Sequence, residues 1–136
     1  MIKEINHDII FLKKKATPAS KKDTQTITDL CDTLAHYQDH CVGMAANMIG
    51  VNKQIIACYF GPFMTVMLNP QITHKENPYT TTEGCLSLAG QREVKRYEKI
   101  TVTYLDKNFT RQSQTFSGFF AQTIQHEIDH LHGILI

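Results

Sequence analysis

Long hydrophobic runs and net charge are both scarce in this sequence. No segment approaches the roughly 20 apolar residues that a helix needs to cross a bilayer, and the opening residues, MIKEINHDIIFLKKK, contain no apolar stretch typical of a signal peptide. Its 14 basic and 13 acidic residues give a formal net charge of +1, so charge predicts no binding to nucleic acid or anionic lipid. We therefore expect a cytoplasmic protein that acts away from membranes and nucleic acid.

Cysteine is sparse as well, and nothing divides the chain. The four cysteines are even in number, but a disulfide framework is expected only in a secreted chain, so we predict reduced thiols. The sequence has no internal repeat, low-complexity segment or linker. A length of 136 residues with 42% hydrophobic composition suits one domain with a real core, spanning residues 1–136.

Four short runs of β-forming residues predict two hairpins. Residues 54–60 and 63–70 are separated by a Gly-Pro pair, and the second run is predicted to end at an Asn-Pro pair. Residues 93–106 contain an alternating stretch, and residues 109–116 can pair with it across a Lys-Asn turn.

Two helices complete the prediction. Residues 24–37 have apolar side chains at helical spacing after a cap at Asp23 or Thr24. A last helix is capped by Ser117 and stopped by Gly133, with an apolar stripe made of Phe120, Ile124, Ile128 and Leu131. We expect an α+β fold in which short, mostly antiparallel strands pack around this central C-terminal helix.

The stretch QHEIDHLHGI, residues 125–134, carries an HExxH pattern on that helix. His126 and His130 are one helical turn apart, so both imidazoles can reach one divalent ion. Glu127 lies beside them and can take a proton from water activated by the ion. Because HExxH also occurs by chance, the alternative is an ordinary polar face of a helix.

A third ligand is available in EGCLSLAG, residues 83–90. A Cys85 thiolate would complete a Cys-His-His set and leave a fourth position open, as catalysis requires. The alternative is that Cys85 is a small buried hydrophobic residue, which is what most free cysteines are. We keep that interpretation for the other three cysteines, Cys31, Cys41 and Cys58.

Three blocks of the chain together resemble the peptide deformylase family. They are EGCLS, QHEIDHLHGI and VGMAANMIG (residues 42–50), the last being similar to the family's G-x-G-x-A-A-x-Q motif. The resemblance covers nearly the whole chain and implies a short, divergent member, with no further helix or strand expected in residues 131–136. This family removes the N-formyl group from the initiator methionine of nascent proteins.

The resemblance also implies roles for particular residues. Cys85, His126 and His130 would hold one divalent metal ion, natively Fe(II), with Zn(II), Ni(II) or Co(II) as replacements. Metal-bound water would attack the formyl carbonyl, and Glu127 as general acid/base would pass the proton to the leaving amine. The backbone N–H of Leu86 would donate to the developing oxyanion.

Further residues are implied to line the substrate cleft: Gly43, Met44, Asn47, Glu83 and Gly84. Glu83 and Arg96 either pair in support of the loop that carries Cys85 or are two ordinary surface charges. The implied partner is an N-formyl-Met peptide, including nascent chains at the ribosome.

The chain departs from the family motif where the formyl group is expected to bind. Met48 replaces the glutamine that donates to the formyl oxygen, and losing such a donor costs about 10²–10³ in kcat. We expect a slow enzyme, unless the Asn47 amide reaches the same oxygen. Cys41 replaces a glycine of the motif, and Gln122 stands where an arginine precedes QHE.

Three functions therefore stay open from the sequence. The first is an active, metal-dependent deformylase, and the second is a low-activity or non-catalytic protein that binds formyl-Met peptides. The third is a hydrolase of a different amide or a zincin-type peptidase. Glu127 favours catalysis because a pure binder needs no general base, whereas Met48 favours weak activity.

Overall fold

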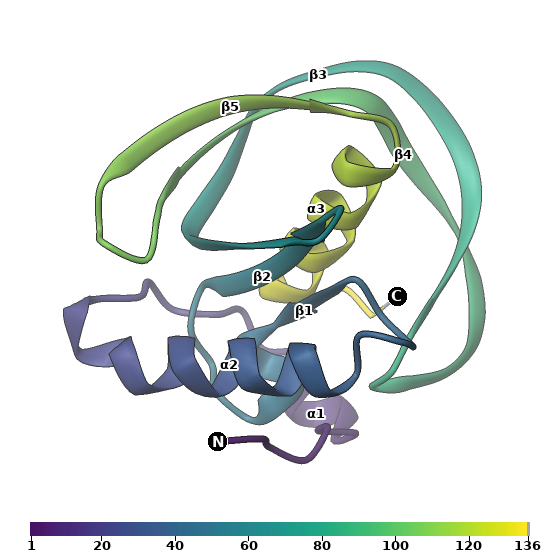
Figure 1. Cartoon of the computed structure of the whole chain (residues 1–136). Coiled ribbons are helices and arrows are strands. Elements are labelled where there is room, and N and C mark those ends of the chain that lie inside the picture. Colours follow the sequence, from purple (N-terminus) through teal and green to yellow (C-terminus); the bar gives the residue numbers. More distant parts are fainter. Residues whose placement is uncertain (136) are drawn as a thin grey trace.

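Five antiparallel strands, hydrogen-bonded in the order β1-β2-β3-β4-β5, curve around the C-terminal helix α3 (Figure 1). The structure is a computed structural model that describes residues 1–135. The strands are β1 (Gly43–Ala45), β2 (Ile55–Phe60), β3 (Phe63–Cys85), β4 (Leu88–Leu105) and β5 (Arg111–Ser117). The helices are α1 (Ile9–Leu12), η1 (Lys21–Asp23), α2 (Thr24–His36), η2 (Ala46–Ile49) and α3 (Gly118–Leu131). The predicted α+β class, with mostly antiparallel strands around a C-terminal helix, is confirmed.

Both predicted hairpins are present, but β3 does not end at the Asn-Pro pair. Asn69 has a φ of 51°, and the register of β3 against β4 shifts between Leu68 and Gln71. Pro70 has no N–H to donate to the ladder, so the pairing is interrupted there. Asn69 can adopt the left-handed φ that this irregularity requires. The strand then continues to Cys85, which pairs with Leu88. Cys85 therefore lies at the end of a long hairpin.

The predicted α2 is confirmed, although its cap differs from the prediction. Asp23 makes no side-chain hydrogen bond to the first turn of α2. Its carboxylate accepts instead from the backbone N–H of Ser20 at 2.8 Å, which closes η1 just before the helix. The short strand β1, whose three residues are all buried, was not predicted because three residues carry no readable periodicity.

Helix α3 is buried on most of its surface, as expected for a central helix. Ile124, Ile128 and Leu131 are all buried. The prediction for Phe120 was wrong, because this side chain is 42% exposed and packs in the first turn against the ring of Phe60. Ser117 precedes the helix but makes no side-chain cap bond.

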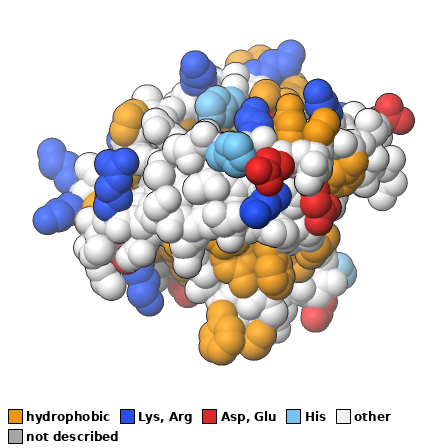
Figure 2. All heavy atoms as spheres, turned by 90° about the horizontal axis from the view of Figure 1, so that it is seen from above, with side chains coloured by type: hydrophobic (Ala, Val, Ile, Leu, Met, Phe, Trp, Pro, Cys, Tyr) orange, Lys and Arg blue, Asp and Glu red, His pale blue; other side chains and the backbone are white. Residues whose placement is uncertain are grey.

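The core lies between α2, the sheet and α3. Its central members are Leu30, Leu34, Ile55, Ile56, Met67, Leu68, Ile100, Val102 and Ile124. On the face seen in Figure 2, basic side chains are spread across the surface, acidic ones lie mainly to the right, and hydrophobic ones gather at the bottom and upper right. Among the described residues, no helix is both long and apolar enough to cross a bilayer.

The chain after α3 runs close to the N-terminal segment. Residues 132–135 form neither helix nor strand, as predicted, and Ile136 lies outside the described residues. Gly133 has a φ of +75°, and a Cβ there would clash with the backbone carbonyl of Lys13. Glycine at this position is therefore required by conformation and by close contact.

We expect Gly133→Ala to lower the free energy of unfolding more than Gly61→Ala. Gly61 also has a left-handed φ, of +63°, but a Cβ there would meet nothing within 4 Å. The control should therefore lose only about 1–2 kcal/mol for backbone conformation, whereas Gly133→Ala must also displace the Lys13 backbone. Urea unfolding of the two variants measures the difference, and equal losses would contradict the close contact.

Candidate metal centre

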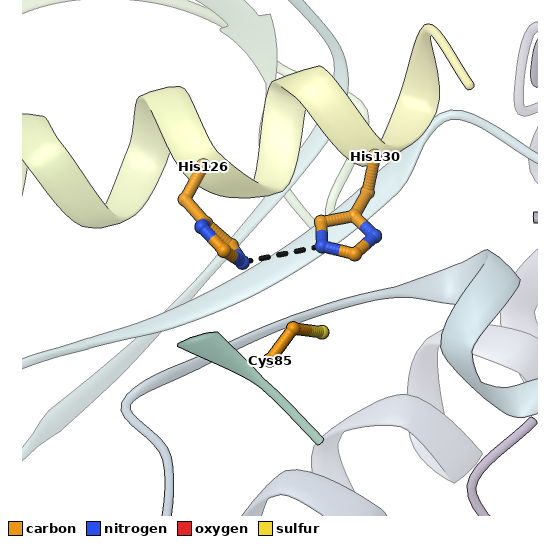
Figure 3. Close-up of side chains that lie close together, drawn as sticks. All are labelled: Cys85, His126 and His130. Carbon is orange, nitrogen blue, oxygen red and sulfur yellow. Dashed lines mark hydrogen bonds between the residues drawn. The ribbon is translucent and has the colours of Figure 1, made fainter. Parts of the chain in front are cut away.

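The hairpin end of β3 and the buried face of α3 together place three metal-binding side chains within reach of one ion. The ligand atoms of Cys85, His126 and His130 all lie within 4.8 Å of one another (Figure 3). The Nε2 atoms of the two histidines, one helical turn apart, face each other at 3.2 Å. The structure thus brings together the three residues predicted as ligands.

The surroundings of the two imidazoles fit a divalent cation. His126 donates its Nδ1–H to Glu83 at 2.7 Å, which makes Nε2, the atom that faces His130, the one available to an ion. Burial lowers the pKa of His130 to about 3, so this ring is neutral, as a ligand must be. Its buried Nδ1 has no partner among the described residues. One thiolate and two imidazoles suit zinc or iron and leave a position for a reacting group.

The electrostatic potential at His126 also favours a cation. Burial lowers the pKa of this imidazole, but hydrogen bonds to Cys85 and Glu83 outweigh burial and raise the pKa to about 10. Groups that hold a proton so strongly also attract a divalent ion at the same place.

Glu83 is the acceptor to which the ligand His126 is fixed. Its carboxylate accepts from the guanidinium of Arg96, with Nη2 at 2.7 Å, and from the amide of Gln122 at 2.8 Å. Burial raises the pKa of Glu83, but hydrogen bonds from His126, Arg96 and Gln122 outweigh it and hold the pKa at about 2. Glu83 and Arg96 therefore form a buried ion pair and are not two surface charges. Arg96 also binds Asp129 at 2.7 Å, which ties β4 to α3.

Glu127 is buried beside the ligands with one oxygen unused. The residue is 4% exposed, and its Oε1 has no hydrogen-bond partner among the described residues. Burial raises its pKa to about 7, so the group can take up and release a proton near neutral pH. A carboxyl group in such a position can act as a general acid or base.

Gly43 in β1 allows the close packing of α3 at this point. A Cβ on Gly43 would lie 3.0 Å from Glu127 Oε2 and 2.8 Å from Thr123 Cγ2. Its φ is not left-handed, so the lack of a side chain matters here and not backbone conformation.

A cavity of about 650 Å³ opens over the three-residue cluster. Of the residues predicted for the site, those that line it are Gly43, Met48, Glu83, Gly84, Cys85, Leu86, His126 and Glu127. Met44 lies in the core, and His130 lies behind the cavity wall at 1% exposed. Asn47 is also 1% exposed, and its amide donates to the carbonyl of His130 at 2.8 Å. The structure thus directs the Asn47 amide toward α3, and Asn47 does not line the cavity.

Sequence reasoning noted Gln122 only as a departure from the family motif and missed its contact with Glu83. Its position four residues before His126, on the same face of the helix, was a usable signal. Gln125 was missed as well. Its side chain donates to the carbonyl of Tyr97 and accepts from the N–H of the same residue, both at 2.8 Å, and so joins α3 to β4.

Comparison with known protein sequences agrees with this geometry. The sequence model of the family described as "Polypeptide deformylase" matches residues 1–136. The chain is 55% identical over 136 residues to a peptide deformylase of Clostridium beijerinckii, covering 100% of both chains. It is 36% identical over 128 residues to a peptide deformylase of Thermoanaerobacter pseudethanolicus, covering 91% of this chain and 79% of the relative.

Solved structures give the same result for the fold. A peptide deformylase from Thermotoga maritima superposes with a TM-score of 0.90 at 28% identity, covering 99% of this chain and 95% of the other. A structure of the Acinetobacter baumannii peptide deformylase with bound Met-Ala-Ser superposes with a TM-score of 0.89 at 28% identity, covering 99% and 97%. The fold, the ligand cluster and the match over the whole sequence lead to one conclusion: this chain belongs to the polypeptide deformylase family.

Proposed function

We propose that the cavity above Cys85 is where this chain, a peptide deformylase and hence a hydrolase, removes the N-formyl group from peptides that begin with formyl-methionine. The observation that carries the proposal is the unused Glu127 oxygen, buried next to a Cys-His-His set at the wall of an open cavity. The Met-Ala-Ser bound by the Acinetobacter baumannii enzyme supports a peptide ligand that begins with methionine. We further propose that residues 1–136 act as one catalytic domain.

Cys85, His126 and His130 would hold one divalent ion in this proposal. When bound, such an ion polarises a carbonyl group and acidifies water. We propose Fe(II) as the native ion, as the family resemblance implies. Zn(II), Ni(II) and Co(II) are proposed as replacements, because the same donor set accepts all four.

Glu127 would transfer the proton during hydrolysis. Water adds to the formyl carbon, and Glu127 takes its proton and gives it to the amine nitrogen as the C–N bond breaks, releasing formate and a free N-terminus. The backbone N–H of Leu86 would donate to the charge that develops on the formyl oxygen. Leu86 lines the cavity at the hairpin end, beside Cys85.

We propose that the substrates are nascent chains, met in the cytoplasm as they leave the ribosome. A formyl-methionine start is the chemical mark that the proposed reaction removes, and newly made chains carry it. A slow enzyme that mainly binds such peptides is the second candidate. It is favoured by Met48, which lines the cavity but whose side chain has no N–H to donate.

Glu127→Gln should abolish most formate release while the protein still binds its ion. The amide cannot accept the proton, so we expect a loss of about 10²–10⁴ in kcat. Formate release from formyl-Met-Ala-Ser and metal content should be measured on the same samples. Glu93→Gln is the matched control, because it makes the same change at an exposed position of β4. Equal activity of the two variants would remove Glu127 from the mechanism.

Met48→Gln should raise kcat by about 10²–10³, by adding the side-chain donor that the natural residue lacks. The Asn47 amide is held by the His130 carbonyl and should not supply this donor in the natural protein. Steady-state kinetics with a formyl-Met tripeptide measures the effect. An unchanged kcat would mean that another group already binds the formyl oxygen.

Gly43→Ala should lower kcat by about 10²-fold, because moving Glu127 away from the added methyl misplaces the proton acceptor. The double variant Gly43→Ala with Thr123→Ser removes the contact with Thr123 Cγ2 but leaves the contact with Glu127. We therefore expect the second change to recover thermal stability and not turnover. Recovery of full turnover would show that the packing at Thr123, and not Glu127, is the constraint.

A further inference from the structure

Gln122 links the wall of the cavity to the carboxylate that orients His126. Its Nε2 donates to Glu83 Oε2 at 2.8 Å, and Gln122 is half-buried in the cavity wall. Arg96, the other main partner of Glu83, does not line the cavity. Gln122 thus lines the cavity and also contacts Glu83, the carboxylate that orients the proposed ligand His126.

The donors divide between the two oxygens of Glu83. Oε1 accepts from His126 Nδ1 at 2.7 Å, from Arg96 Nη2 at 2.7 Å and from Arg96 Nε at 3.2 Å. Oε2 accepts from Arg96 Nε at 3.0 Å and from Gln122 Nε2 at 2.8 Å. A carboxylate has about four acceptor sites, so these contacts, with Arg96 Nε shared between the two oxygens, use its whole capacity. Without Gln122, one site of a buried, ionised carboxylate would lose its partner.

Gln122 and His126 bind the same carboxylate from the same helix. They lie one turn apart on α3, so Glu83 bridges positions i and i+4 of that helix. The hydrogen bond from Gln122 on α3 to Oε2 resists rotation of the carboxylate group away from His126. Arg96 opposes the same rotation from β4.

We infer that Gln122 is a positioning residue for the metal centre. It holds Glu83 so that Oε1 stays on His126 Nδ1, which fixes the orientation of the ring and makes Nε2 the atom that binds an ion. In this role Gln122 touches neither the ion nor the substrate. The inference rests on the metal site of the proposed function, but binding of the ion can be measured without any turnover.

The test is the affinity for Co(II) of the full chain, measured by competition with a chelator. We expect Gln122→Met to weaken Co(II) binding by about 10-fold or more, the usual range for loss of a group that supports a metal ligand. Gln122→Arg keeps N–H donors and should bind Co(II) nearly as well as the natural protein. Gln112→Met is the matched control, because it removes a glutamine donor to another carboxylate, that of Asp106 at 3.1 Å, at the start of β5.

Two further readouts separate positioning from general stability and from substrate contact. Imidazole ¹⁵N and ¹H shifts of the Zn(II)-loaded protein report the hydrogen bond made by His126 Nδ1–H, and we expect a weaker bond in Gln122→Met than in Gln112→Met. KM for formyl-Met-Ala-Ser should not change when the variant is saturated with Co(II). Should Gln122→Met fail to fold, Gln122→Ala makes the same deletion with less steric demand.

Unchanged Co(II) affinity in Gln122→Met or Gln122→Ala would overturn the inference, as would a raised KM with normal affinity, which would make Gln122 a substrate contact. Failure of the proposed function would look different. In that case the natural protein would bind Co(II) without releasing formate, or would bind no Co(II) at all, and the second result would overturn the inference as well.

Discussion

The ionised carboxylate of Glu83 is the group on which the arrangement of the site depends. It is buried, and its oxygens accept from β4 through Arg96 and from α3 through His126 and Gln122. Truncating one partner of a buried ion pair commonly destabilises a protein by about 3–5 kcal/mol, because the remaining charge is left uncompensated. The buried charge of Glu83 is stabilised only by these hydrogen bonds, and they therefore hold the end of the β3–β4 hairpin against α3.

The metal centre follows from this contact. Cys85 comes two residues after Glu83, and the register of the hairpin shifts between Gly84 and Cys85. Fixing Glu83 on His126 thus brings the thiol to the two imidazoles (Figure 3). Gln125 of α3 is satisfied in the same manner, since it bonds the backbone of Tyr97 in β4. Most buried polar side chains have such partners, so the unpartnered Glu127 Oε1 and His130 Nδ1 are exceptions among the described residues, and both lie at the candidate site.

The parts of the site fixed by local geometry could be predicted from the sequence. The spacing of His126 and His130 determines one helical face, and EGCLS pointed to Cys85, which the structure places beside them. Features set by tertiary contacts could not be predicted. The continuation of β3 past the Asn-Pro pair depends on pairing with β4, and the exposure of Phe120 depends on which part of α3 the sheet covers. The amide of Asn47 has a buried carbonyl within reach, and only the folded chain shows that it takes this partner.

The central claim is that the cluster of Cys85, His126 and His130 holds a divalent ion that enables deformylation in this chain. The most direct measurement is formate release from formyl-Met-Ala-Ser by natural protein purified anaerobically and loaded to graded levels with Fe(II). The account predicts formate release that rises in proportion to bound iron and stops at one ion per chain. Full iron occupancy without formate release, or release that does not depend on bound iron, would contradict it.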